Sequence, residues 1–390
     1  MSTKTIGSAL TAAAVLCSVA ACSAETPAGD DCVVRIGSIF SQTGAASVFG
    51  VDGERAIALA VEDVNAEGFE VDGRQCTVEY RAEDLASDPT NAAALAQDLV
   101  NGFGAQYIFG PDMAAAVPPV ATAVQRSGTT MLLSVSTGMD DYTGQGEPFF
   151  RLSPPDGAMV SEGYIPAVAA ELDGVESIAV LMNDDETGRQ LAPVYAEAFA
   201  EAGIETVRTE YYDPGSTNFS PIVRRIDRDS VDALFIGYNN DGSAAAIMDA
   251  ALEAGLPGTF ITRGISAQPG VDRADQLDAY TWLILGADPL YPADEAQSAF
   301  VERFTEHFGI EAERMTYFPF VHYDYVGMLV QAMQEAGTTT DVEKVSEALR
   351  GAAYEGVVQL SFDDDGINTS PMAAGFLRDG DSEVVLFGGN

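Results

Sequence analysis

The chain has 390 residues, with 60 Asp and Glu residues against 19 Lys and Arg residues, so its formal net charge at pH 7 is −41. A field of this sign and size repels nucleic acids and anionic lipids, which argues against a protein that binds phosphate backbones. The length exceeds what one ordinary hydrophobic core occupies and predicts two domains.

The amino terminus has the layout of a secretory signal peptide. Lys4 precedes a small and apolar run over residues 6–21 that contains no acidic residue. This run is too short for a membrane-spanning helix, which needs roughly 18 or more apolar residues. Residues 1–21 are therefore predicted to be a signal peptide that is removed from the mature protein.

A cysteine follows the apolar run directly. The sequence Val19-Ala20-Ala21-Cys22 has the arrangement of a bacterial lipoprotein box, in which cleavage falls before the cysteine and the thiol is acylated. We therefore expect a lipid anchor on Cys22, with an ordinary signal peptide and an incidental cysteine as the alternative. Residues 22–31 have few side chains to bury and are expected to form a flexible tether.

Short apolar runs alternate with amphipathic helical stretches from residue 33 onward. Asp88 before Pro89 predicts a helix start, because a capping side chain precedes a proline at the first helical position. The alternation of strand and helix predicts a parallel sheet with helices on both faces. Strands are expected over residues 33–40, 76–82, 105–110 and 130–134, and helices over residues 51–66, from 88 onward and over 114–126.

The same rhythm restarts after residues 149–157 and predicts a second sheet. The helices near the carboxyl terminus are too many for a tail, so we expect them to complete the first lobe. Further strands are expected over residues 177–183, 205–212, 232–238, 258–262 and 280–287, and near 357–363, 372–378 and 383–387. Further helices are expected over residues 157–172, 188–202, 217–228, 243–254, 293–308, 316–336 and 341–350.

The predicted fold class is α/β, with two doubly wound parallel-sheet lobes joined by a hinge of three strands. The first lobe is expected to comprise residues 33–151 and 288–358, and the second lobe residues 154–284 and 362–390. Open sheets of this kind bind ligands at the carboxyl ends of their strands.

The cysteines of the folded part predict a disulfide bond. Cys17 is lost with the signal peptide and Cys22 is the predicted lipid site, so Cys32 has only Cys76 as a partner. These two residues lie at the amino ends of the first two predicted strands, which are neighbours in the usual doubly wound order. An exported chain also lies in a compartment that permits disulfides. Two separately buried thiols are the alternative.

Several stretches resemble the periplasmic substrate-binding proteins of branched-chain amino-acid ABC transporters, the leucine/isoleucine/valine-binding type. Residues 36–68 resemble the opening strand, glycine turn and first helix of that family, and residues 216–226 with 231–238 resemble a helix and strand of its second lobe. Residues 322–350 and 357–368 resemble its closing section. The resemblance implies a type I clamp that holds a small-molecule ligand between two lobes and presents it to ABC permease subunits. It also implies an extracytoplasmic monomer, and the predicted lipid site at Cys22 leads us to expect membrane attachment only through that anchor.

The resemblance places ligand contacts at strand ends and helix starts. Val135 and Thr137 align with positions that hold a ligand carboxylate, and a simple helix cap is the alternative for this loop. Phe49 and Phe318 align with apolar walls, and Tyr238 aligns with a tyrosine at the cleft face of the second lobe, with ordinary packing as the alternative. The predicted ligand-binding residues are Phe49, Asp112, Met113, Ala114, Val135, Ser136, Thr137, Thr187, Tyr238, Arg263, Gly264 and Phe318.

Three of these positions depart from the family. Ala114 replaces a serine that contacts the carboxylate, Thr187 replaces a large aromatic residue, and Gly264 replaces the acidic residue that holds the ligand ammonium. Beside it, Arg263 suits a second carboxylate, and a guanidinium that points into solvent is the alternative. The departures lower the expectation of leucine, isoleucine or valine and favour a small acid, an amide or another polar metabolite.

Amino acids stay open as ligands. Three acidic residues stand at predicted strand ends and could supply the counter-charge to an ammonium, namely Asp112, Asp184 and Asp185. A ligand-sensing receptor subunit with the same clamp fold is the alternative function.

Residues that carry catalytic or metal chemistry are scarce. His307 and His322 are the only histidines, and each lies in a predicted helix with no second metal ligand near it in sequence. No nucleophile elbow, phosphate-binding loop or dinucleotide-binding glycine motif follows any predicted strand. The acidic segment 362–368 lacks the glutamate that an EF-hand loop has at its twelfth position. We therefore predict no enzyme activity, no cofactor and no metal.

Overall fold

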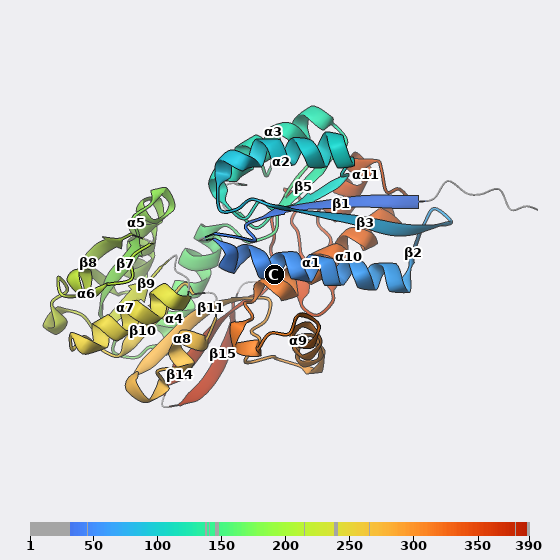
Figure 1. Ribbon diagram of the computed structural model, residues 1–390. Helices are drawn as coiled ribbons and strands as arrows, with labels where there is room; N and C mark the ends of the chain where they lie inside the picture. Colours follow the sequence, from blue (N-terminus) through green and yellow to red (C-terminus); the bar gives the residue numbers. More distant parts are fainter. Residues whose placement is uncertain are drawn as a thin grey trace, which may run out of the picture. The chain divides into compact units, whose positions relative to one another are not determined.

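The computed structural model describes residues 32–387 apart from residues 45, 137, 138, 140, 145–147, 214, 238–240, 265 and 379 (Figure 1). The predicted signal peptide, the tether and the predicted lipid site at Cys22 lie outside the described residues. None of the described helices has the length and apolar character that crossing a membrane requires.

The first sheet has six strands in the order β2-β3-β1-β4-β5-β6. Five of them pair in parallel, as the alternation of strands and helices predicts. β2 pairs antiparallel with β3 through Asp72 and Gly73, whose φ values of 51° and 74° suit a two-residue hairpin turn. Sequence analysis missed β2 and β6, because three residues carry too little periodicity. The strands are β1 (Cys32–Phe40), β2 (Phe69–Val71), β3 (Arg74–Asp84), β4 (Tyr107–Phe109), β5 (Met131–Ser134) and β6 (Phe149–Arg151).

Helices cover both faces of the first sheet. Ile39 and Phe40 are neighbours in β1, so their side chains point to opposite faces and join different cores. The core around Phe40 is closed by helices α1, α10 and α11, and α1 and α10 pack together (Figure 1). The core around Ile39 is closed by α2 and α3. These helices, with α9, are α1 (Ser47–Glu67), α2 (Ala92–Gln97), α3 (Val117–Ser127), α9 (Glu295–Phe308), α10 (Phe318–Ala336) and α11 (Val342–Leu349).

The second sheet has seven strands in the order β15-β14-β11-β10-β9-β7-β8. β11, β10, β9, β7 and β8 pair in parallel, and β14 and β15 add an antiparallel edge, as is common in doubly wound sheets. The strands are β7 (Ser177–Asn183), β8 (Glu205–Tyr212), β9 (Ala233–Ile236), β10 (Thr259–Thr262), β11 (Ala279–Leu285), β14 (Met372–Arg378) and β15 (Asp381–Phe387).

The helices of the second sheet differ from the predicted ones in three places, one of which is the short α8 (Gln268–Val271), which was not predicted. The helix expected over 157–172 begins as a π-helical segment, Gly157–Tyr164, before it continues as α4 (Ile165–Glu171). The helix expected over 217–228 is reduced to α6 (Ser220–Val223), because Asp227 accepts a hydrogen bond from the Asp229 amide and starts a separate turn. The remaining helices are α5 (Glu186–Glu201) and α7 (Asp241–Glu253).

The chain passes between the two sheets three times. The first crossing follows β6, the second follows β11, and the third follows the hairpin of β12 (Ala353–Glu355) and β13 (Gln359–Ser361). The first and third crossings are hydrogen bonded to each other, since the Arg151 amide donates to Gly366 O at 2.9 Å and the Asn368 amide donates to Arg151 O at 3.0 Å. This arrangement confirms the predicted hinge of three strands.

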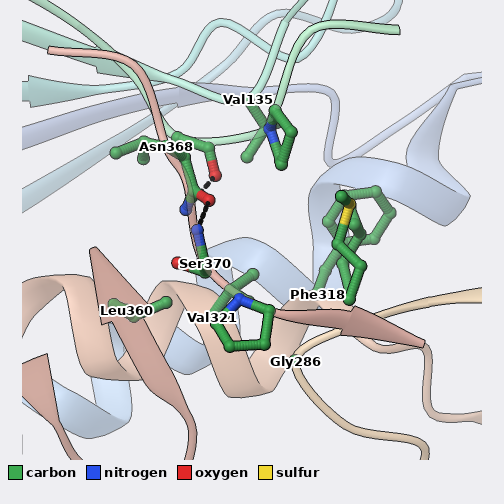
Figure 2. Close-up of a pocket in the computed structure, with 12 residues that line it drawn as sticks. Val135, Gly286, Phe318, Val321, Leu360, Asn368 and Ser370 are labelled. Atoms are coloured by element: carbon green, nitrogen blue, oxygen red, sulfur yellow. Dashed lines mark hydrogen bonds between the residues drawn. The ribbon is translucent and has the colours of Figure 1, made fainter. Parts of the chain in front are cut away.

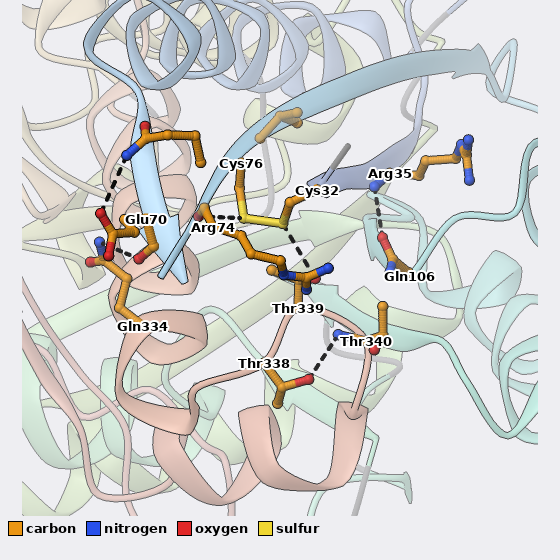
Figure 3. The surroundings of a disulfide bond; sticks show 12 residues. Cys32, Arg35, Glu70, Arg74, Cys76, Gln106, Gln334, Thr338, Thr339 and Thr340 are labelled. Atoms are coloured by element: carbon orange, nitrogen blue, oxygen red, sulfur yellow. Dashed lines mark hydrogen bonds between the residues drawn. A yellow bond between two sulfur atoms is a disulfide. The ribbon is translucent and has the colours of Figure 1, made fainter. Parts of the chain in front are cut away.

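Cys32 and Cys76 form a disulfide bond, which confirms the predicted pairing (Figure 3). The two residues are direct partners in the parallel register of β1 and β3, with their Cα atoms 4.5 Å apart. The loop after α10 lies beside the bond, and there the Tyr107 hydroxyl donates to Thr339 O at 3.0 Å. The disulfide therefore ties together the amino ends of two neighbouring strands.

Candidate functional site

A small cavity lies where the three crossings meet (Figure 2). Its volume is about 20 Å³, which is room for about one water molecule. Two predicted ligand-binding residues line it, Val135 after β5 and Phe318 at the start of α10. Val135 also packs against the apolar cores of both sheets. The other lining residues are Leu152, Pro154, Leu285, Gly286, Val321, Leu360, Asn368, Ser370, Pro371 and Met372.

Buried polar groups hold the crossings around this cavity in place. The Asn368 side chain donates to Leu152 O at 3.3 Å and accepts from the Ser370 amide at 2.8 Å (Figure 2). Arg151 is fully buried, and its guanidinium donates to Ser153 O at 2.9 Å and to Pro154 O at 3.2 Å. The Asn368–Leu152 bond joins the third crossing to the first, and the Arg151 bonds hold the backbone of the first crossing itself.

The carboxyl ends of β1, β4 and β5 bring three polar residues to one edge of the first sheet. They are Ser41, Asp112 and Ser136, which lie in the loops after strands that are neighbours in the sheet. The Ser41 amide donates to Asp112 Oδ2 at 3.0 Å, and its hydroxyl donates to Oδ1 at 3.1 Å. Burial raises the pKa of Asp112 to about 6. The Ser136 amide donates to Ser134 Oγ at 3.0 Å. We call this group the first-lobe rim.

Two further predicted residues follow Asp112. Met113 is half-buried and packs against the core under α2 and α3. Ala114 is half-buried and begins the helical turn Ala114–Ala116. Its methyl group cannot donate the hydrogen bond that a serine would provide there.

An aromatic pair stands next to the first-lobe rim. Phe49 and Phe318, from the first turns of α1 and α10, meet edge to face with ring centroids 6.0 Å apart. Gly50 explains how α1 approaches the rim so closely, because a Cβ atom at this position would lie 2.4 Å from Ser41 O. The two aromatic residues predicted as apolar walls therefore lie together, beside the loop that carries Ser41.

In the second sheet, the Arg263 guanidinium lies 2.9 Å from the Asp156 carboxylate (Nη2 to Oδ1). The side chains are 16% and 8% exposed, so this is a largely buried ion pair. The Tyr195 hydroxyl also donates to Asp156 Oδ1, at 3.2 Å. Asp156 neutralises the positive charge that Arg263 was expected to add. Next to it Gly264 is buried, and a Cβ atom there would lie 3.0 Å from Thr262 Oγ1.

The start of α5 uses its acidic residues locally. Asp185 is the N-cap, since its Oδ1 accepts from the Gly188 amide at 2.7 Å. Asp184 Oδ1 lies 2.7 Å from Arg189 Nε and forms an exposed ion pair. Thr187 is half-buried in the first turn of the same helix.

Two predicted residues, Thr137 and Tyr238, lie outside the described residues. Sequence analysis in turn missed Ser41, Asp156 and Tyr195. A polar residue directly after β1 was the available signal for Ser41. No local sequence pattern marks Asp156 and Tyr195. Asp156 pairs with Arg263, which is far from it in the sequence, and Tyr195 in turn donates to Asp156.

The fold and the site define a two-lobed α/β binding protein, with polar groups and an aromatic wall at strand ends beside a hinge of three crossings. Across the described part of the chain, no group of three or more His, Cys, Asp or Glu side chains is placed to hold a metal ion. Residues 33–381 match the sequence profile of the family described as "Periplasmic binding protein", and the chain belongs to this family. Its curated relatives include Leu/Ile/Val-binding proteins, and its structural neighbours include solute- and substrate-binding proteins of ABC transporters.

Two curated relatives show how far the likeness extends. The leucine-, isoleucine-, valine-, threonine- and alanine-binding protein of Pseudomonas aeruginosa is 24% identical over 338 residues, which covers 83% of this chain and 84% of the relative. The Leu/Ile/Val-binding protein homolog 3 of Brucella melitensis is 26% identical over 227 residues, which covers 57% of this chain and 59% of that relative.

Solved structures share the fold. The leucine-binding protein LivK of Thermotoga maritima superposes with a TM-score of 0.74 at 20% identity, over 91% of this chain and 98% of that protein. A solute-binding protein of an ABC transporter from R. palustris, solved with 4-hydroxybenzoate, superposes with a TM-score of 0.70 at 19% identity, over 92% and 96%. These likenesses establish the type I periplasmic-binding-protein fold.

Proposed function

We propose that this protein is an extracytoplasmic solute-binding protein, anchored by a lipid on Cys22, that delivers a small polar ligand to an ABC permease. The observation that carries the proposal is the meeting of the first-lobe rim with the Phe49–Phe318 pair beside the hinge. A polar head group and an apolar body are then received by adjacent surfaces of one lobe. Closure of the second lobe about the three crossings would enclose the ligand.

The ligand belongs to the amino acids, amides or carboxylates. The backbone and hydroxyl groups of Val135, Ser136 and Thr137 are proposed to receive its polar head, because short polar residues at strand ends offer donors to a carboxylate or carbonyl. Phe49 and Phe318 are proposed to cover its apolar part. Leucine and 4-hydroxybenzoate, the ligands named for the two structural neighbours, share this combination of a carboxylate and an apolar body.

The lobes are proposed to divide as the sequence predicts. Residues 33–151 with 288–358 would move as the first lobe, and residues 154–284 with 362–390 as the second. The two separate sheets and the return of α10 and α11 to the first sheet support this division.

A thermal-shift screen of the purified mature protein tests the proposal. The panel contains the L-amino acids, their amides, small dicarboxylates and benzoates. A true ligand at 100 times its dissociation constant should stabilise the protein by about 2.7 kcal/mol. Phe318→Ala should lose most of that stabilisation, whereas Phe308→Ala, in the α9 region of the same lobe, should keep it. A folded protein that none of these compounds stabilises would contradict the proposal.

A further inference from the structure

The first-lobe rim contains a carboxylate, Asp112, that forms no ion pair with the described Lys and Arg side chains. Of the 19 Lys and Arg residues only Lys4 precedes residue 32, and all the others lie in the described part of the chain. The ion pairs of that part include none with Asp112, and its carboxylate accepts hydrogen bonds from the Ser41 amide and hydroxyl. The other acids considered for the site are engaged, with Asp156 on Arg263, Asp184 on Arg189 and Asp185 as a helix cap.

The carboxylate of Asp112 keeps the capacity to accept further donors. A carboxylate has about four acceptor positions, and Ser41 occupies two of them. Asp112 is half-buried, so bulk water only partly solvates its charge. The raised pKa reflects the same desolvation. A cationic group that docks beside Asp112 would relieve this cost, because a desolvated charge gains most from a paired partner.

The position of Asp112 connects this charge to the ligand surface. β4 lies between β1 and β5, so Asp112 stands between Ser41 and the Val135–Ser136 loop. The contact of Gly50 with Ser41 brings Phe49 to the same edge. A single small ligand could therefore place one group at Asp112 and its other groups against the rest of the rim and the Phe49–Phe318 pair.

The second lobe does not supply a net positive charge to compensate. Arg263 is the positively charged residue among the predicted site residues, and its guanidinium forms an ion pair with Asp156. Among the described site residues, the balance of charge is therefore negative, and Asp112 is its source. A ligand that brings only a carboxylate would meet this charge unfavourably.

We infer that Asp112 is the counter-ion for a ligand ammonium group and selects amino-bearing ligands over plain carboxylates. This inference rests on the proposed function, because it names the ligand class of the same site. It places the ammonium in the first lobe, and it reverses the preference for an acid that Arg263 and Gly264 suggest from sequence alone.

Isothermal titration of the mature protein with matched probes tests the inference. The probes are L-leucine, L-threonine and L-alanine, the deaminated analogue 4-methylpentanoate, and benzoate. Wild type should bind at least one of the amino acids, and 4-methylpentanoate should bind at least 10-fold more weakly than that amino acid. Asp112→Asn keeps an acceptor for Ser41 but removes the charge. It should weaken the amino acid roughly 10- to 100-fold, the usual effect of losing a charged hydrogen bond. It should bind 4-methylpentanoate at least as tightly as the wild type does, because the negative charge that opposes a plain carboxylate is gone.

Two further variants separate charge from structure. Ser41→Ala removes a hydrogen bond of the same cluster but keeps the carboxylate, so it should weaken the amino acid less than Asp112→Asn does. Glu79→Gln removes an exposed acid on β3 that pairs with Arg35 on β1, and it should leave binding unchanged. Equal affinity of wild type and Asp112→Asn for the amino acid overturns the inference. So does binding of benzoate or 4-methylpentanoate without any amino acid, although the proposed function then stands. Binding of no probe and no compound of the thermal-shift panel contradicts both.

Discussion

His322 is a buried histidine on α10 whose ring must remain uncharged in the folded protein. Its Nδ1 lies 2.9 Å from Phe318 O, and its ring meets Phe40 edge to face at 5.4 Å. Burial lowers the pKa of His322 to about 4. Because the unfolded chain binds this proton near its ordinary pKa of about 6.5, the stability that a neutral His322 allows is lost as the pH falls from about 6.5 to 4.

The comparison of wild type with His322→Asn isolates this effect. The variant should be less stable at pH 7, because the ring loses its packing against Phe40 and Phe318. The difference in unfolding free energy between wild type and variant should shrink by about 2 kcal/mol at pH 4.5. At that pH only the unfolded wild type gains stability from protonation of His322. Urea unfolding at both pH values measures it. Burial raises the pKa values of Asp112 and Asp324 to about 6, but both proteins share these groups, so they cancel. A constant difference across this pH range would show that His322 does not titrate as described.

At the scale of elements, α1 depends on a glycine for its close approach to β1. A Cβ atom at Gly50 would lie 2.4 Å from Ser41 O, which is a backbone atom that cannot move aside cheaply. Gly50→Ala should therefore destabilise the protein by about 1–3 kcal/mol and weaken ligand binding, since it displaces Phe49 from the rim. Chemical denaturation and titration with the selected ligand measure the two effects.

Gly53 is the matched control, one turn further along the same helix. A Cβ atom there would meet its nearest neighbour, the His322 ring, at 3.4 Å, which is an ordinary contact. Gly53→Ala should therefore be tolerated, helped by the higher helix propensity of alanine. If the two alanine variants are equally stable and bind equally well, the close approach at Gly50 has no role.

The disulfide between Cys32 and Cys76 is a second feature that stabilises the arrangement of elements. It joins two strands and closes a loop with a sequence separation of 44. On the chain-entropy account such a loop contributes about 4 kcal/mol. The double variant Cys32→Ala, Cys76→Ala should unfold at lower urea by a corresponding amount, and reduction of the wild type should reproduce this shift. The same midpoint for oxidised wild type and the variant would refute this account.

The elements differ in how far their sequence predicts them. α1 was predictable because Ile57, Val61 and Val64 repeat at helical spacing, and a continuous apolar run marked β1. Phe49, Val135 and Phe318 could be placed because strand ends and helix starts meet at one edge of such a sheet. The Asp156–Arg263 pair could not be predicted, because an ion pair between residues far apart in the chain depends on tertiary geometry that no local pattern encodes.

At the scale of the whole molecule, membrane attachment is predicted to depend on one thiol. Cys22→Ser should release the protein from the membrane fraction or block its processing, because the acyl chains have no other site of attachment in the predicted motif. Cys17→Ser, which changes only the signal peptide, should leave fractionation as it is in the wild type. Cell fractionation with immunoblotting checks both. Retention of the Cys22→Ser variant in membranes to the wild-type extent would contradict the lipid anchor.

The central claim is that two lobes close on a small ligand around the hinge of three crossings. Small-angle X-ray scattering of the mature protein, with and without the ligand that the thermal-shift screen selects, measures this most directly. The account predicts a smaller radius of gyration in the presence of saturating ligand, at every protein concentration, because a hinged monomer becomes more compact on closure. An unchanged radius of gyration for a protein that demonstrably binds the ligand would contradict the clamp mechanism.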